Sequence, residues 1–213
     1  MAEVQEKQIN KRSPEQREAR IARARLLESL VYEMWAGKPV YYAGYKDVLN
    51  GTKAVEEVMS SSLLQGILVA KLVARLMNAL NEDEFTVVTN ELGIQFKKND
   101  WRACDVAIFS TAQLADQDLT KYAWIPPKIA IAVDTKADFT RFHSDFNYYQ
   151  EKTTQLLNFG TEKVIWIFTE SKKIWIAEPG KDWILKNWDQ PIDVLPGCSF
   201  VLDVLLTGKK PTP

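Results

Sequence analysis

Charged side chains interrupt two stretches of the sequence that otherwise have the composition of buried strands. Asp105 lies within residues 103–109, and Asp134 and Lys136 lie at the end of residues 129–136. An ionised carboxylate taken out of water is costly unless a cation or several hydrogen bonds meet it, so such residues tend to persist where they do chemistry. Hard divalent cations prefer oxygen ligands. Two aspartates and a lysine therefore predict a metal site.

Side-chain alternation predicts the neighbours of each acid. With a period of two, Asp105 shares its strand face with two alanines, and Asp134 shares its face with two more and with Lys136. These alanines are Ala103, Ala107, Ala130 and Ala132. If the two strands are neighbours, the small side chains leave a concavity beside the carboxylates, and larger aliphatic residues fill the opposite layer. A hydrated cation could fit in that concavity.

Two further charged residues could join this site. Glu91 alternates away from the apolar residues that follow it and could add a metal oxygen, although an exposed strand acid has the same pattern. Lys152 falls on the apolar stripe of an expected helix, where its amine either reaches water along the surface or points toward the carboxylates. Asp105 and Asp134 could also pair with Lys136 and Lys152 in a structural ion network without catalysis.

The composition places limits on the class of protein. The chain has 213 residues, of which 46% are hydrophobic and 26% charged, and this fits one soluble globular domain. Its N-terminal stretch has no apolar core typical of a signal peptide, and no run is long enough to span a bilayer, so we expect a cytoplasmic protein without membrane partners. Two cysteines, Cys104 and Cys198, and the single His143 cannot supply a disulfide framework or a structural zinc site.

The balance of charge argues against strong non-specific binding to nucleic acid. The chain has 27 basic and 28 acidic residues, whereas affinity for phosphates comes largely from clustered cations. A local basic groove remains compatible with this balance. The candidates are Lys97 with Lys98, Lys136 with Arg141, and an N-terminal arm containing Lys7, Lys11, Arg12, Arg17, Arg20, Arg23 and Arg25. Each of these runs could equally be a solvated surface.

The elements expected to position the charged residues alternate between helices and strands. A helix capped by Ser13 should run to Met34, strands should follow within 40–59 around an Asn50-Gly51 turn, and a helix with an apolar stripe should begin after Ser62 and cover the sheet. Strands are expected at 85–88, 92–96 and 103–109, at the segment carrying Asp134, and at 164–168, 173–177 and 184–188, with a helix at 144–159. The fold class is therefore mixed α/β. We expect one domain over 13–207, with disordered ends at 1–12 and 208–213.

Several short motifs occur in a recognisable order along this framework. They are Met59-Ser60-Ser61 before a helix, Cys104-Asp105-Val106-Ala107, Ala132-Val133-Asp134, Lys152 in a helix, and the segment 159–167 that follows it. This order resembles the PD-(D/E)xK nuclease superfamily and, more closely, the Uma-two family of restriction-type endonucleases. The resemblance covers roughly residues 32–206. It implies a restriction-endonuclease-like core, in which a central mixed sheet is flanked by helices and extended here by an N-terminal helix.

The resemblance also implies a chemistry for the charged residues. Asp105 and Asp134, with Glu91 as a further candidate, would hold Mg²⁺ or Mn²⁺, and Lys136, assisted by Lys152, would be the catalytic amine for hydrolysis of a DNA phosphodiester. Three departures from the family pattern stand out. They are Gln65 where the family usually has histidine, Asp134 where it mostly has glutamate, and Cys104 where proline is usual.

Three functions follow as hypotheses from these observations. The first is a metal-dependent DNA endonuclease. The second is a binding or assembly module that retains the fold without the chemistry, as the missing histidine and the modest net charge suggest. The third is a hydrolase of small phosphates. The long N-terminal helix and the abundant aromatic residues further predict a homodimer.

Overall fold

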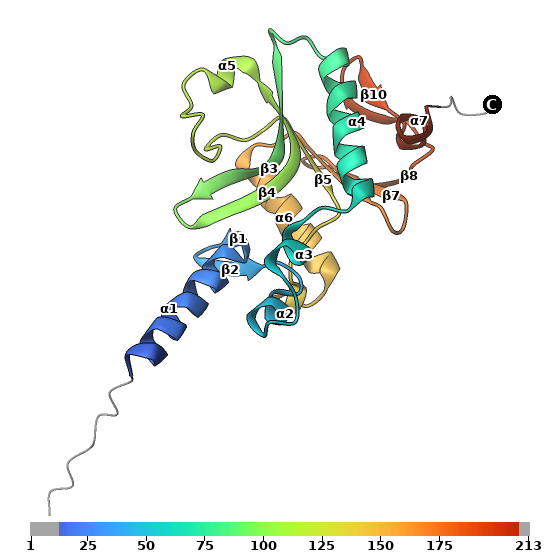
Figure 1. The fold of residues 1–213 in the computed structure, drawn as a ribbon. Coiled ribbons are helices and arrows are strands. Elements are labelled where there is room, and N and C mark those ends of the chain that lie inside the picture. Colours follow the sequence, from blue (N-terminus) through green and yellow to red (C-terminus); the bar gives the residue numbers. More distant parts are fainter. Residues whose placement is uncertain (1–12, 209–213) are drawn as a thin grey trace, which may run out of the picture.

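The computed structural model describes residues 13–208. Within this range, eight strands form one sheet in the order β2-β1-β4-β5-β6-β7-β8, and β3 pairs with β4. The strands are β1 (Val31–Trp35), β2 (Lys38–Tyr41), β3 (Phe85–Lys97), β4 (Asp100–Ser110), β5 (Ile129–Val133), β6 (Lys163–Phe168), β7 (Lys173–Ala177) and β8 (Ile184–Asn187). β5 and β6 are parallel, whereas the other pairs are antiparallel. This mixed sheet flanked by helices confirms the predicted fold class (Figure 1).

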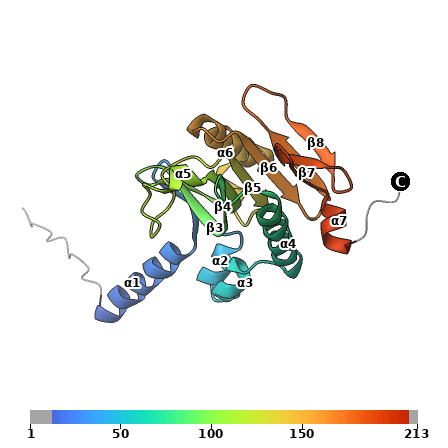
Figure 2. The same ribbon diagram turned by 90° about the horizontal axis from the view of Figure 1, so that it is seen from above.

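Two long helices cover opposite faces of the sheet. Figure 2 shows α4 (Leu63–Ala79) on one side and α6 (Asp145–Phe159) on the other. Each begins at a serine whose hydroxyl accepts a hydrogen bond from the backbone N–H three residues later, Ser62 for α4 and Ser144 for α6. α6 ends at Gly160, whose φ of 119° is a conformation that favours glycine. Both helices agree with the sequence-based expectation.

The α4 face of the sheet is an aliphatic core. Leu68, Leu72 and Leu76 of α4 are buried in one cluster with the large aliphatic residues of the central strands. Those residues are Val106, Ile108, Ile129, Ile131, Val133, Ile165 and Ile167. The expectation that larger aliphatic residues fill the layer opposite the alanines is therefore confirmed.

The α6 face differs from the prediction. The four strand alanines are buried there, at 0–6% exposure, in one cluster with Tyr148 and Trp166. Ala132 lies directly beside Trp166 in the β5–β6 register. The predicted concavity is therefore absent on this face, because large aromatic side chains occupy the volume that the alanines leave.

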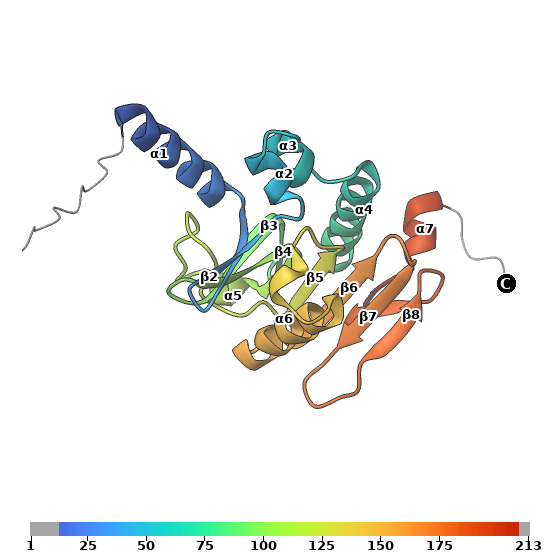
Figure 3. The ribbon, with the colours of Figure 1, turned by 90° about the horizontal axis from the view of Figure 1, so that it is seen from below.

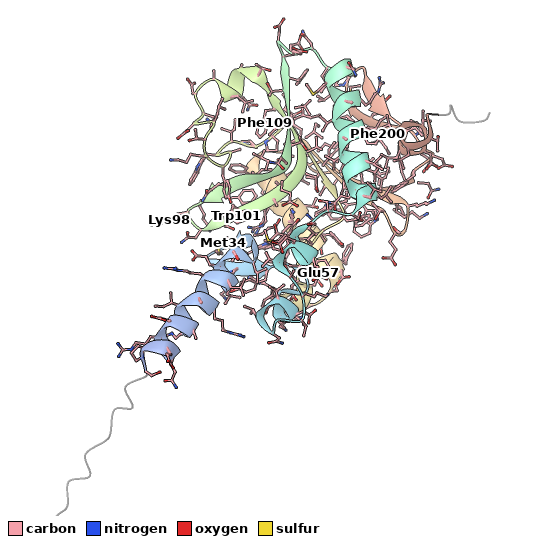
Figure 4. All side chains as sticks on the ribbon, viewed as in Figure 1. Met34, Glu57, Lys98, Trp101, Phe109 and Phe200 are labelled. Carbon is pink, nitrogen blue, oxygen red and sulfur yellow. The ribbon has the colours of Figure 1, made fainter. Side chains whose placement is uncertain are left out.

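The N-terminal elements also depart from the prediction. The first helix, α1 (Pro14–Ser29), ends five residues before Met34, and the following residues form β1 instead. Val31–Trp35 pairs with β2 and, through Met34 opposite Trp101, with β4, so sheet pairing overrides the helical spacing (Figure 4). Part of the region expected to be stranded contains two short helices, α2 (Tyr45–Leu49) and α3 (Val55–Met59), which are joined through the Asn50-Gly51 turn.

The remaining short elements complete the fold. They are α5 (Thr111–Leu114), the 3₁₀ helix η1 (Phe139–Arg141), the β9 (Ile192–Leu195) and β10 (Cys198–Phe200) hairpin, and α7 (Leu202–Thr207). The hairpin and α7 were not predicted, and the two strands expected at 85–88 and 92–96 are one bulged strand, β3. The disorder predicted for 1–12 and 209–213 lies outside the described residues. Gly208 is described and ends α7 with a φ of 68°.

Candidate functional site

A pocket of about 550 Å³ opens between the first turns of α4 and the middle of β3. It contains three of the residues singled out from the sequence, Asp105, Glu91 and Lys136, together with Gln65. The other lining residues are Met59, Ser61, Gly66, Val69, Ala70, Val73, Thr89 and Asn90. The charged groups therefore meet on the α4 side of the molecule, away from the face on which the strand alanines lie.

Asp105 is held where β4 and β5 separate. The two strands pair from Ile108 opposite Ile129 to Val106 opposite Ile131, and beyond that point the Asp105 Oδ2 accepts the N–H of Val133 at 2.8 Å. The carboxylate thus continues the contact between the strands by replacing a backbone acceptor.

Gln65 links the first turn of α4 to the same carboxylate. Its Nε2 donates to Asp105 Oδ1 at 3.2 Å and to the Val133 carbonyl at 2.9 Å. Gln65 is the position where the resemblance led us to expect histidine, and its side chain is buried. The amide fixes the orientation of Asp105 by the hydrogen bond that it donates.

A β-bulge brings Glu91 toward the pocket. Asn90 and Glu91 together oppose Asp105, because Thr89 pairs with Val106 and Leu92 pairs with Cys104. Both bulge residues are left-handed, with φ of 80° and 52°. Such conformations are uncommon outside glycine and occur often at sites where a bulge re-aims a side chain.

Lys136 joins β3 to the loop before α4. Its Nζ lies 2.5 Å from Glu91 Oε1, 2.9 Å from the Met59 carbonyl and 3.2 Å from Ser61 Oγ. Tyr42 donates a longer hydrogen bond of 3.4 Å to the other oxygen of Glu91. Burial raises the pKa of Tyr42 to about 12, and nearby Glu91 adds to the rise, so the phenol remains a donor. The three donor hydrogens of Lys136 are matched by three acceptors, which are Glu91, the Met59 carbonyl and Ser61.

Asp134 lies elsewhere, which corrects the predicted pairing of its side chain with Lys136. β5 ends at Val133, and Asp134 has a φ of 55°, so the strand alternation on which that prediction depended does not continue. Its Oδ1 accepts the backbone N–H of Thr169 at 2.8 Å, and its Oδ2 accepts the Thr169 hydroxyl at 2.6 Å. Asp134 is not among the residues that line the pocket. Its role as a metal ligand stays a prediction.

Lys152 also lies outside the pocket lining, in a buried ion pair. Its Nζ is 2.6 Å from Glu33 Oε1, and the two side chains are 2% and 0% exposed, so of the two alternatives the one in which the amine reaches water is wrong. Glu33 also accepts hydrogen bonds from Trp35 Nε1, the Ala103 N–H and the Tyr148 hydroxyl. The catalytic role of Lys152 stays a prediction.

Glu33 was missed in the sequence although a signal was present. It is an acid within an apolar run, the same pattern that pointed to Asp105. The assignment of residues 14–34 to a helix concealed the pattern, because alternation has meaning only on a strand. Glu57, labelled in Figure 4, is a nearby acid with a local structural role, because its carboxylate accepts the Ala54 N–H at the start of α3.

Burial dominates the electrostatics of Asp105. Desolvation raises the pKa of this carboxyl above its ordinary value, and the negative charge of Glu91 raises it further. The Val133 N–H, the charge of Lys152 and the Gln65 amide act in the opposite direction but do not cancel the rise in pKa. Among residues 13–208, no cation forms an ion pair with Asp105. The carboxylate would therefore gain stability from a cation placed in the pocket.

The available donors fit a hard, partly hydrated ion. Across the described part of the chain, no three His, Cys, Asp or Glu side chains are grouped so that they could enclose a metal. Mg²⁺ usually binds through one or two carboxylates, keeps several waters and takes its remaining ligands from substrate phosphates. Asp105 and Glu91 supply that number of carboxylates, although Glu91 is engaged by Lys136.

Comparison with known proteins places the fold in a structural class. No protein-family model and no curated protein matches the chain. A solved structure with the same mixed α/β architecture is described as a "putative nuclease belonging to DUF820" from Anabaena variabilis ATCC 29413. It is 12% identical, has a TM-score of 0.61, and the match covers 82% of this chain and 89% of the other. At this identity the likeness shows that the two chains share a fold, and membership of the Uma-two family stays a prediction.

No helix within residues 13–208 combines the length and the apolar character needed to cross a bilayer.

Cys104 and Cys198 are both buried and unpaired thiols, as expected. Burial raises the pKa of Cys104 to about 12, and Asp105 adds to the rise, so this thiol is a core residue beside the site.

Proposed function

We propose that this protein is a metal-dependent phosphodiesterase that cleaves nucleic acid, most specifically a DNA endonuclease, at the pocket between α4 and β3. The observation that carries the proposal is the Asp105 carboxylate, which is fixed by Gln65 and Val133 and faces an open pocket without an ion-pair partner. Glu91 and Lys136 share this pocket. The nuclease-like fold of the solved relative supports the same class of reaction.

Asp105, Glu91, Lys136 and Gln65 each have a role in this proposal. Asp105 and Glu91 would hold Mg²⁺ or Mn²⁺, and the cation would supply polarisation of the phosphodiester and a more acidic bound water. Lys136, which now donates to Glu91, would turn one of its donor hydrogens to a phosphate oxygen once the glutamate holds the cation. Gln65 would keep Asp105 in place throughout. Asp134 could contribute only if its carboxylate left Thr169.

The test combines cleavage with binding of the cation. We expect the purified chain to cut plasmid or single-stranded DNA with Mg²⁺ or Mn²⁺, and we expect Asp105→Asn and Lys136→Met to reduce cutting to background. Asp182→Asn, which changes an exposed aspartate just before β8, is the matched control and should retain full activity. Cutting that survives Asp105→Asn or chelation of the cation would refute the proposal.

A second function has one observation in its favour. The three donors of Lys136 are satisfied within the protein, and an amide stands where the resembling family usually has histidine, as expected for a module that binds without catalysis. Titration calorimetry with Mn²⁺ separates the two functions. Heat of binding that is lost in Asp105→Asn supports the hydrolase, and the absence of such heat supports the binding module.

A further inference from the structure

The proposed site has little means of attracting a polyanion. Among the residues that line the pocket, Lys136 is the single cation, and Glu91 already pairs with it. The pocket wall contributed by α4 consists of Gln65, Gly66, Val69, Ala70 and Val73, which carry no charge. Affinity for nucleic acid comes mainly from cations that displace counterions from phosphates. If the proposed function is right, that affinity has to come from another surface.

Helix α1 has the charge that the pocket lacks. Four arginines, Arg17, Arg20, Arg23 and Arg25, occur within nine residues that contain one acid, Glu18. No ion pair within residues 13–208 involves any of these arginines. α1 has no buried residue, and all three ribbon views show it projecting from the body of the protein (Figures 1, 2 and 3). Among residues 13–208, no carboxylate therefore competes with a ligand for the guanidinium groups of these arginines.

The arginines are arranged as a ridge. Arg17, Arg20 and Arg23 are spaced by three residues, so they fall within about 120° around the helix axis, whereas Glu18 lies on the other side. One of the three also anchors the helix, because Arg23 Nη1 donates to the Leu49 carbonyl at the end of α2 at 3.0 Å. The ridge thus has a defined position relative to the neighbouring elements.

Helix α1 lies on the same side of the molecule as the pocket. Figures 2 and 3 agree in placing α1, α2, α3 and α4 on one side of the sheet and α6 on the other. The last residue of α3, Met59, lines the pocket, and Arg23 contacts α2. A strand entering the pocket past α3 would therefore come within reach of α1.

We infer that the arginine ridge of α1 binds the phosphate backbone of the nucleic acid whose phosphodiester enters the pocket. This inference rests on the proposed function. A second copy of the chain is the other occupant to consider, but a helix-to-helix contact needs an apolar stripe. Ile21 is the one large hydrophobic residue of α1 that is exposed. The arginine ridge therefore favours a polyanion over a second copy of the chain.

The experiment measures binding without catalysis. The full chain, in chelator so that no divalent cation is present, is titrated by fluorescence anisotropy against one labelled 20-nucleotide strand and against the matching duplex over a range of salt concentrations. The variant Arg17→Gln/Arg20→Gln/Arg23→Gln removes the ridge while keeping good helix formers. The control Lys172→Gln/Lys173→Gln/Lys181→Gln removes the same charge near the turns flanking β7.

The expected results differ clearly between the two variants. Loss of three phosphate contacts should lower the slope of log K against log salt by about 2 for the single strand and about 3 for the duplex, and should weaken binding at least about tenfold at 0.1 M salt. The control should change neither quantity. Arg17→Lys/Arg20→Lys/Arg23→Lys keeps the charge and should keep the slope, and a normal circular dichroism spectrum of the Gln variant excludes loss of the fold.

The inference fails if the Gln variant binds both probes with an unchanged slope, or if light scattering shows that the variant only converts a dimer into a monomer. Failure of the proposed function gives a different pattern. If the chain binds DNA through α1 but does not cut it, the proposed hydrolase function alone is refuted. If the chain cuts DNA and its binding is unchanged by loss of the ridge, only the inference about α1 is refuted.

Discussion

Removal of the Lys152 ammonium should expose the structural role of the buried ion pair. In Lys152→Met, the methionine keeps an unbranched apolar side chain in the same place, while Glu33 remains 0% exposed and loses a cation 2.6 Å away. The carboxylate retains hydrogen bonds from Trp35, Ala103 and Tyr148. It is then a buried charge with hydrogen bonds but no ion-pair partner among residues 13–208, although the buried guanidinium of Arg102 still acts on it through space.

The size of the effect follows from this geometry. Removing one partner of a buried pair costs about 3–5 kcal/mol. Because three hydrogen-bond donors still stabilise the Glu33 carboxylate, we expect a loss of unfolding free energy at the lower end, about 3 kcal/mol. For a chain of this length that corresponds to a fall in Tm of about 6–12 °C. The double variant Glu33→Gln/Lys152→Met has no buried charge at this place, so a double-mutant cycle should give a coupling energy of about 2 kcal/mol.

Urea unfolding followed by tryptophan fluorescence measures these quantities. Lys181→Met is the matched control, because Lys181 pairs with Glu178 while 67% of its side chain is exposed, and its loss should cost less than about 1 kcal/mol. If Lys152→Met costs no more than this control and the cycle shows no coupling, the structural explanation is wrong. Lys152 would then be available for the catalytic role predicted from the sequence.

Two further predictions concern Asp105 and Gly93. Because the pKa of Asp105 lies above its ordinary value of 3.8, ionisation of this group opposes folding, so its contribution to stability should decline as pH rises from 3.8 through the raised pKa. Asp105→Asn should abolish that decline in urea titrations. On acidification, Mn²⁺ binding to the unmodified protein should be lost at a pH above 3.8, because the protonated carboxyl no longer binds the cation. Gly93→Ala should cost about 1–3 kcal/mol, because a Cβ there would lie 2.7 Å from the ring of Tyr122. Gly66→Ala, with no atom within 4 Å of the new Cβ, should be neutral or stabilising, and equal losses for the two glycines would contradict the packing argument.

The sequence was informative where one periodicity dominated a segment. The stripe of Leu68, Leu72 and Leu76 and the serines before it predicted α4 correctly, and the helix expected at 144–159 agrees with α6. Segments with two possible readings were assigned wrongly. Val31–Trp35 continues a helical spacing and also has the composition of a strand. Its pairing with the adjacent β2 and with β4, which is distant in sequence, decides the outcome.

The site could be predicted only in part for a similar reason. The sequence identified Asp105, Glu91 and Lys136, which the structure brings to one pocket, because charge inside apolar runs is visible without coordinates. The orientation of Asp134 could not be derived, since it depends on a left-handed residue directly after β5 and on Thr169 at the end of β6. The role of Gln65 as the donor to Asp105 requires knowledge of how α4 packs across β4 and β5.

The bulge in β3 decides how easily the proposed chemistry could be lost. Deleting one codon from the pair Asn90 and Glu91 would restore a one-to-one register with β4 and would remove at least one left-handed residue. Loss of the Glu91 codon would at the same time remove the second carboxylate from the pocket. Under selection for stability alone, a single deletion would thus give an inactive descendant with an intact sheet. Restoring the site would require an insertion that puts a residue back into a strained, left-handed backbone conformation.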